Sequence, residues 1–458
     1  MGADRGFLQP APADRELTIA AIDPGNDPRV DSRQAWARLA SALALMTLGS
    51  APMYVISVVL PVVQGEFGVA RADASLPYTL LLVGFGLGGV LMGKLAERFG
   101  IMRCILIGAG GLALGFVAAG TSSTLLGFAL AHGVLLGLLG SSATFAPLVA
   151  DTSLWFARRR GIAVAVCASG NYVAGAFWPP VVQHFIETSG WRATYVGLGV
   201  LCAIAMPLLA LRMRAPSPVI GSDRATAAPA GLGSERAAST AAPVVAAAST
   251  PDRDRPMGFS VGVATALLCV AGVACCVAMA MPQVHIVAYC GELGFGAAAG
   301  AQMLSLMLAC GIVSRLVSGV VCDRIGGLRT LLLGSVLQGI ALLLFLPFDS
   351  LVSLYAVSAL FGLFQGGIVP AYAIIVREHF PAKGMSARVG LVLMCTLFGM
   401  ALGGWLSGKV FDLTGTYEAA FLNGLGWNGV NIAITLLLLG GASGWWNRRR
   451  PGLATAPS

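Results

Sequence analysis

Long runs of apolar residues recur along the chain, each about as long as a helix that crosses a bilayer. A hydrocarbon core of about 30 Å needs roughly 20 apolar residues in a helical span, and short charged or Gly/Pro-containing turns separate the runs. We expect spans at 39–63, 75–96, 101–121, 124–150, 161–186 and 191–211, and then at 258–289, 297–320, 328–348, 351–376, 389–411 and 419–439. The pattern predicts an all-α membrane protein with twelve transmembrane helices in two six-helix halves.

The segments outside these runs divide the chain into five parts. We expect an amino-terminal tail at 1–37, a first half at 38–211, a linker at 212–257, a second half at 258–440 and a tail at 441–458. The linker is rich in Ala, Pro, Ser and Thr, which is typical of a flexible tether. The first tail has no basic start followed by an apolar core, so we do not expect a cleaved signal.

Basic residues in the short loops predict the orientation, because cytoplasmic loops carry an excess of Arg and Lys. If the amino terminus is inside, the basic residues of the inner loops are Lys94, Arg98, Arg103, Arg158, Arg159, Arg160, Arg324, Arg329, Arg377, Lys383 and Arg388. The outer loops then contain only Arg71, Arg192 and Lys409. We therefore expect a multi-pass protein of the inner (plasma) membrane with both termini in the cytoplasm.

Composition narrows the function. A hydrophobic fraction of 57% and a charged fraction of 11% do not suit a soluble surface. The net charge of +8 comes from clusters between apolar runs rather than one basic stripe, so we expect no nucleic-acid partner. The ten cysteines lie in or beside apolar runs without metal-ligand spacing, which indicates packing residues, and we expect no metal or cofactor.

No pattern typical of an enzyme stands in a suitable context. There is no nucleophile with a base, no metal cluster and no phosphate loop, so we expect no enzymatic activity. The segment 84–89 satisfies GxGxxG, but it lies in an apolar run with no preceding strand. The spacing of Gly84 with Gly88, and of Gly89 with Gly93, instead indicates close helix packing.

Two loops repeat each other across the halves. Each places a Gly, an acid followed by Arg, a second Gly and a further basic residue after the second span of its half. The residues are Gly93, Glu97, Arg98, Gly100 and Arg103, and Gly319, Asp323, Arg324, Gly326 and Arg329. This resembles the signature loop of the major facilitator superfamily, and its repetition indicates internal duplication. The first glycines would let helices approach closely, and the acid–Arg pairs would latch the inward gate. The alternative is that they are topology charges without a gating role.

A narrower resemblance lies in the fifth span. Residues 155–163 and 168–175 resemble the fifth-helix entry of the monocarboxylate transporter and oxalate/formate antiporter branch. The segments Gly-Trp-Arg at 190–192 and Asp-Leu-Thr-Gly at 412–415 are also typical of the superfamily. The superfamily resemblance covers the chain except its tails and linker, whereas the branch resemblance depends on two helices.

Arg315 is the exception within the apolar runs. It lies in the span at 297–320 among Leu, Val, Ser and Gly, and an intramembrane Arg costs about 3 kcal/mol on insertion scales, so it is expected to face a cavity or a partner. Its backbone lies roughly 12 Å from Asp323 at the inner boundary. The matching residue of the first half is Gly89, so the shared fold does not require a cation there, and a functional role is favoured. The alternative is a structural Arg that reaches the inner interface.

The branch resemblance implies that Arg315 binds a substrate carboxylate, since members of the branch carry such an Arg in the eighth helix. A guanidinium can hold a carboxylate by two parallel hydrogen bonds. The sequence also departs from the branch. Gly311 stands where animal monocarboxylate carriers have an acid, and the Lys residues of the first and eleventh helices are absent. One buried cation suits one carboxylate better than two.

Four further polar residues within the spans are candidates for the substrate site. Asn171 and Tyr172 lie about ten residues into the fifth span, and Gln365 lies near the middle of the tenth. His285 in the seventh span, with His132 in the fourth, is a titratable candidate for proton coupling. The alternatives are hydrogen bonds between helices for the first three, and packing roles for the histidines.

Together these features predict a secondary active transporter that moves a small organic anion, a monocarboxylate by the branch resemblance. We expect alternating access of the two halves, proton symport, the anion and the bilayer as partners, and a monomer. The closest alternative is a drug or metabolite exporter of the same fold, in which Arg315 is structural. A non-transporting membrane sensor is the alternative of another class, and the lack of a signalling module in the linker and tails disfavours it.

Overall fold

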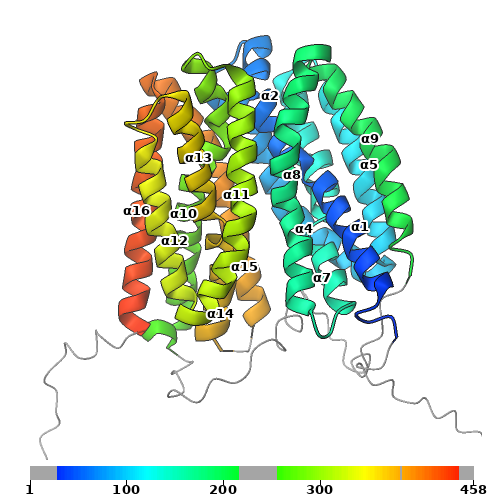
Figure 1. Cartoon of the computed structure of the whole chain (residues 1–458), viewed down its shortest axis with the longest axis vertical. Coiled ribbons are helices and arrows are strands. Elements are labelled where there is room, and N and C mark those ends of the chain that lie inside the picture. The colour runs from blue at the N-terminus through cyan, green and yellow to red at the C-terminus, as the bar shows by residue number, and fades with distance from the viewer. Residues whose placement is uncertain (1–27, 216–254, 382–383, 443–458) are drawn as a thin grey trace, which may run out of the picture.

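The computed structural model describes residues 28–215, 255–381 and 384–442. In this part of the chain, twelve helical spans are long and apolar enough to cross a membrane. They form two bundles side by side, the amino-terminal one coloured blue to green and the carboxy-terminal one yellow-green to red (Figure 1). The predicted all-α fold of twelve spans in two six-helix halves is confirmed. Most of the predicted tails and of the linker lies outside the described residues, so the five-part division stays a prediction.

All predicted spans correspond to helices, and many helices run past the predicted ends. The first half consists of α1 (Arg33–Gly49), α2 (Ala51–Phe67), α3 (Arg71–Ala74), α4 (Leu76–Phe99), α5 (Ile101–Gly120), α6 (Leu125–Leu130), the π-helix η1 (Ala131–Ser141), α7 (Ala146–Leu154), α8 (Arg160–Ser189) and α9 (Trp191–Leu211). The second half consists of the 3-10 turn η3 (Pro256–Gly258), α10 (Val261–Glu292), α11 (Gly296–Ile325), α12 (Gly327–Leu344), α13 (Leu351–Gln365), α14 (Ile368–His379), α15 (Met385–Thr414) and α16 (Tyr417–Ala442).

Three spans that we predicted as continuous are interrupted helices. The first is interrupted at Ser50 and the fourth at Phe145, and in each case a proline, Pro52 or Pro147, follows in the next helical turn. A proline has no N–H group to continue the helical hydrogen bonds, so it is tolerated where a new helix begins. The tenth span is interrupted at Gly366, where a Cβ atom would lie 2.4 Å from a backbone oxygen of α11.

Glycines of α4 allow the close packing that their spacing predicts, but only on one face. A Cβ atom at Gly84 would lie 2.0 Å from the Gly133 oxygen, and one at Gly88 would lie 2.2 Å from the Leu138 oxygen, both on η1. The packing interpretation of GxGxxG is confirmed for this pair. The prediction for the second pair is wrong in this conformation, because a Cβ atom at Gly89 or at the glycine four residues later meets no described atom within 4 Å.

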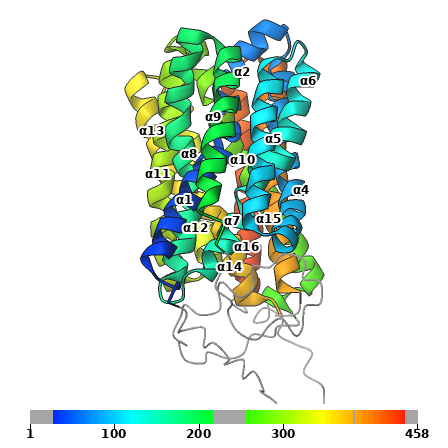
Figure 2. The ribbon, with the colours of Figure 1, turned by 90° about the vertical axis from the view of Figure 1, so that its right-hand side faces the viewer.

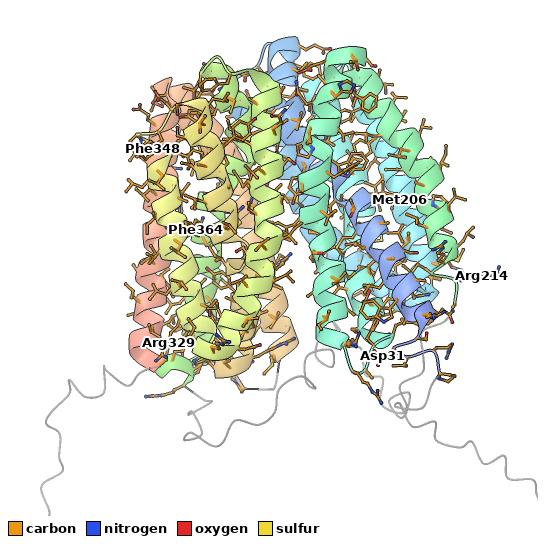
Figure 3. All side chains as sticks on the ribbon, viewed as in Figure 1. Asp31, Met206, Arg214, Arg329, Phe348 and Phe364 are labelled. Atoms are coloured by element: carbon orange, nitrogen blue, oxygen red, sulfur yellow. The ribbon has the colours of Figure 1, made fainter. Side chains whose placement is uncertain are left out.

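The two ends of the bundle differ in which helices begin and end there. At the tail end α1 begins and α9 and α16 end, whereas α2 ends at the opposite end, called the far end here (Figures 1 and 2). Asp31 and Arg329 lie at the tail end and Phe348 lies toward the far end (Figure 3). Between the halves, α8 packs against α11, and α3 and α4 pack against α15.

Hydrogen bonds between the halves lie at the far end and at mid-depth. Thr79 Oγ1 donates to the Ala401 oxygen at 2.9 Å, and Ser305 Oγ donates to the oxygen of Ala176. Arg315 makes the bond that lies nearest the tail end. In the described part of the chain, no hydrogen bond joins the halves between Arg315 and the tail end. The hydrogen bonds between the halves therefore extend from the far end to mid-depth.

Candidate functional site

Arg315 of α11 lies between the halves, against α8. Its Cζ atom is 4.9 Å from the centre of the Tyr172 ring, and its Nη1 donates a long bond of 3.4 Å to the Ala168 oxygen. The ion pairs among the described residues do not include this guanidinium. A partly buried cation that rests on an aromatic face, without a carboxylate partner, can accept an anion.

A glycine one turn before Arg315 makes this contact possible. A Cβ atom at Gly311 would lie 2.5 Å from Cε1 of Tyr172, so the ring fits only because the side chain is absent. The branch resemblance implies an acid at this position, and here the glycine instead leaves space for the tyrosine. The departure from the branch pattern thus has a structural reason.

Asn171 directly precedes Tyr172 in α8 and forms hydrogen bonds with residues of the first span. Tyr54 Oη donates to Asn171 Oδ1 at 2.6 Å, and Asn171 Nδ2 lies 3.4 Å from Ser50 Oγ, at the interruption between α1 and α2. Tyr54 is 5% exposed. The structure therefore brings Arg315 and Tyr172 into contact at the interface. Asn171, the residue before Tyr172, bonds Tyr54 within the first half.

Gln365 lies inside the second half. It is fully buried, and its Oε1 accepts a bond of 2.9 Å from Gln283 Nε2 of α10. Its own Nε2 is buried with no partner among the described residues. The pair joins α10 to α13 as the predicted bond between helices would, and substrate contact by Gln365 stays a prediction.

Neither histidine lies beside Arg315. His285 is fully buried, with Nε2 2.8 Å from the Gly404 oxygen and Nδ1 3.4 Å from Tyr417 Oη. His132 is also fully buried, between the Phe128 oxygen and the Tyr195 hydroxyl. Both side chains are packed in the interior and hydrogen-bonded there. A substrate or proton-coupling role for His285 stays a prediction.

The predicted gating residues all lie near the tail end. Glu97, Arg98, Asp323 and Arg324 are exposed, and none of them takes part in an ion pair with another described residue. A Cβ atom at Gly93 or Gly319 would meet no described atom within 4 Å. The predicted close approach at these glycines is therefore absent in this conformation. A latch there stays a prediction for the state in which the tail end is closed.

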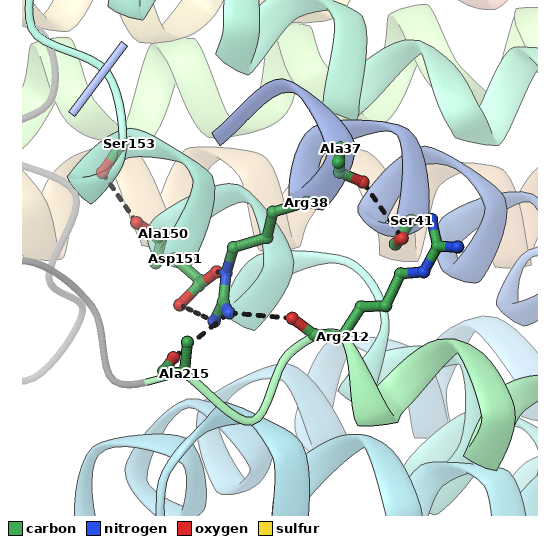
Figure 4. A network of polar contacts seen from close by, with 8 residues as sticks. All are labelled: Ala37, Arg38, Ser41, Ala150, Asp151, Ser153, Arg212 and Ala215. Atoms are coloured by element: carbon green, nitrogen blue, oxygen red, sulfur yellow. Dashed lines mark hydrogen bonds and ion pairs between the residues drawn. The ribbon is translucent and has the colours of Figure 1, made fainter. Parts of the chain in front are cut away.

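A buried ion pair that the sequence analysis did not predict ties the tail end of the first half together (Figure 4). Arg38 Nε and Nη2 donate to the Asp151 carboxylate at 2.8 and 3.0 Å. Arg38 Nη1 donates to the backbone oxygens of Arg212 and Ala215. Arg38 Cζ lies 4.5 Å from the centre of the Trp155 ring. The contacts join α1, α7 and the residues that follow α9.

Both charges of this pair lie just outside the predicted spans, because the predicted first span begins at residue 39 and the predicted fourth span ends at residue 150. The sequence signal for this ion pair is a base directly before the first span and an acid directly after the fourth, which places both charges at the same end of the bundle. Arg71, which we expected to be a loop charge, is likewise buried at 7% exposure at the far end. Its signal is weaker, because its partners in the second half lie more than 200 residues away in the chain.

Comparison with known proteins agrees with this architecture. Residues 41–337 and 264–457 match the family model described as Major Facilitator Superfamily. Monocarboxylate transporter 13 of Bos taurus is 26% identical over 73% of this chain and 73% of its own length. Monocarboxylate transporter 4 of Mus musculus is 25% identical over 92% of this chain and 86% of its own. An uncharacterized MFS-type transporter of Escherichia coli, YhjX, is 24% identical over 79% and 85%.

Solved structures share the fold at low sequence identity. A bacterial homolog of the human lysosomal transporter Spinster, solved in an inward-facing and occupied conformation, superposes with a TM-score of 0.63 at 15% identity. The match covers 95% of this chain and 100% of that one. The unoccupied inward-facing form gives a TM-score of 0.61 at 13% identity.

Proposed function

The chain belongs to the Major Facilitator Superfamily, and from this premise we propose that it transports a small organic anion, a monocarboxylate, around Arg315. The observation that supports this most is the guanidinium at the interface of the halves, which has no ion-pair partner among the described residues. Similarity to monocarboxylate transporters over most of the chain supports the same substrate class.

The binding step follows from the chemistry of the guanidinium. A carboxylate would take two parallel N–H···O bonds from Arg315, which fixes its orientation as well as its charge. The Tyr172 ring lies against the guanidinium, with its centre 4.9 Å from Cζ. The hydroxyl of Tyr54 and the amide of Asn171, the residue before Tyr172, hold each other in place. The organic part of the substrate would then contact these partly apolar side chains.

Transport would proceed by alternating access of the two halves. The described conformation has inter-half hydrogen bonds at the far end and at mid-depth, which suits a state closed on that side. We propose that the protein lies in the inner (plasma) membrane with its tail end facing the cytoplasm, as the basic loops indicate. On this assignment the substrate would leave toward the cytoplasm from the present state. The loops of Glu97 and Asp323 would close that side in the opposite state.

Proton symport is the coupling we propose. An anion that enters a negative-inside cell works against about 2.3 kcal/mol per 100 mV of membrane potential. A proton that moves with each monocarboxylate removes this cost, because the net charge carried is zero. The measurement is acidification inside proteoliposomes when a monocarboxylate is added outside. Uptake without acidification would reject symport while leaving the anion transport in place.

The substrate class is tested by ligand-induced stabilisation of the purified protein. A ligand that binds the native state raises the melting temperature with its concentration. We expect monocarboxylates to raise it, and their amides, which lack the charge, to have no effect. Stabilisation by hydrophobic cations and not by carboxylates would reject the proposal and favour the exporter alternative.

A further inference from the structure

Asp412 of α15 joins the two halves at the far end. Its Oδ1 accepts a hydrogen bond from the backbone N–H of Arg71 at 2.9 Å, and its Oδ2 accepts one from Ala72 at 2.8 Å. These N–H groups begin the short helix α3, and donors in the first turn of a helix have no partner within it. A carboxylate of the second half thus satisfies backbone donors of the first.

The side chain of Arg71 is inserted into the second half. Its Nη1 donates to Tyr417 Oη at 2.8 Å, and its Nη2 pairs with Glu292 Oε1 at 2.9 Å. Its Cζ lies 4.2 Å from the centre of the Phe411 ring. Only Nε is held in its own half, by Gln64 at 2.9 Å. The charge of Arg71 is therefore balanced mainly by the opposite half.

Glycines four residues apart give this contact a steric part. A Cβ atom at Gly408 would lie 2.9 Å from the backbone nitrogen of Ala72. One at Gly404 would lie 2.9 Å from the Tyr78 ring. Gly404, Gly408 and Asp412 share one face of α15, because residues four apart lie above one another on a helix. Closure at the far end therefore needs both the small residues and the carboxylate.

His285 supports the contact from within the second half. Its ring bonds the Gly404 oxygen through Nε2 and lies beside Tyr417 Oη through Nδ1. The histidine thus connects the glycine face of α15 to the tyrosine that holds Arg71.

We propose that Arg71, Asp412 and Gly408 form the gate that closes the far end of the transport pathway. The inference rests on the proposed function, since a gate presupposes alternating access. To open the far side, Arg71 must leave its position between Glu292 and Phe411, and Asp412 must leave the first turn of α3, because both contacts cross between the halves. Gly408 lets α15 return to the backbone of α3 when the gate closes.

The test is a distance measurement by electron spin resonance in lipid nanodiscs without substrate. Spin labels are placed on Thr188 of the first half and Asp349 of the second, both exposed near the far end, in a background in which the native cysteines are replaced. Loss of one charge-assisted hydrogen bond shifts a two-state equilibrium by about tenfold or more. We expect Arg71→Gln and Asp412→Ala each to raise the ratio of long to short distances at least that much.

Gly408→Leu should give the same shift without changing any charge, because its side chain would occupy the space of the α3 backbone. Two matched variants should leave the distances unchanged. Asp73→Asn alters an exposed acid on the same short helix, and Gly429→Leu adds a side chain where a Cβ atom meets no described atom within 4 Å.

Parental distances in Gly408→Leu and Arg71→Gln, with normal elution and melting of both proteins, would overturn the gate. Should Arg71→Gln fail to fold, Gly408→Leu alone decides, since it removes no hydrogen bond. The result is independent of the substrate, because none is present. A gate shift together with no carboxylate binding would support the gate and reject the proposed substrate.

Discussion

Removal of the charge at Arg38 should destabilise the protein more than removal of its partner's charge. The pair is buried, with side chains 4% and 9% exposed. Arg38→Met leaves the carboxylate of Asp151 buried without its two donors, and breaking a buried ion pair in this way costs about 3–5 kcal/mol. Asp151→Leu leaves the guanidinium with the oxygens of Arg212 and Ala215 and with the face of Trp155. We expect a cost of about 2 kcal/mol for that variant.

The double variant Arg38→Met with Asp151→Leu removes both charges together. Only the two backbone oxygens then lose their donor, so we expect a cost of about 1–2 kcal/mol. Additivity of the single costs would give about 5–7 kcal/mol. The difference between the two figures is the coupling between the charges.

The assay is reversible unfolding of the purified protein in mixed micelles with increasing sodium dodecyl sulfate, followed by circular dichroism. Free energies of unfolding from the parent, both single variants and the double variant complete the cycle. A cost below about 1 kcal/mol for Arg38→Met, or a double variant as unstable as the sum, would refute the reasoning. Either result would mean that water reaches the pair.

Three further predictions concern other parts of the fold. Gly311→Ala places a Cβ atom 2.5 Å from the Tyr172 ring, so it should weaken carboxylate binding several-fold in a ligand-induced melting assay, and unchanged binding would contradict the packing argument. Asp323→Asn should change the transport rate and the labelling of cysteines placed at the tail end more than the substrate affinity, and a change in affinity alone would make it a binding group. Gly84→Ala should cost about 1–3 kcal/mol of unfolding free energy by overpacking against η1, whereas Gly89→Ala, in open space, should cost little; equal costs would refute the difference in packing.

Span lengths were predictable because the bilayer imposes them. A helix that crosses about 30 Å of hydrocarbon must be apolar over its length. Each of the twelve apolar runs corresponds to a helical span that is long enough to cross a membrane. Interruptions were not predictable from run length, since hydropathy averages over a proline such as Pro52 or a glycine such as Gly366. Their cause is local, a missing N–H group in one case and a crossing helix in the other.

The candidate site was predictable only as far as depth along a helix decides it. Arg315 and Tyr172 lie at similar depth on different spans, and the structure does bring them together. Which loop residue turns back into the bundle does not follow from the pattern of any single span, so Arg71 was expected at the surface. The glycines before Asp412, with a spacing of four, are the feature of the sequence that points to a close contact there.

Binding of a labelled monocarboxylate to purified Arg315→Gln tests the central claim most directly. Loss of a charge-assisted hydrogen bond costs about 2 kcal/mol, or roughly thirtyfold in affinity, and loss of the paired charge adds to this. Arg315→Lys keeps the charge without the planar fork, so its affinity should lie between those of the parent and Arg315→Gln. Arg33→Gln, an exposed Arg at the start of α1, should bind like the parent. Parental affinity in a correctly folded Arg315→Gln protein would contradict the account.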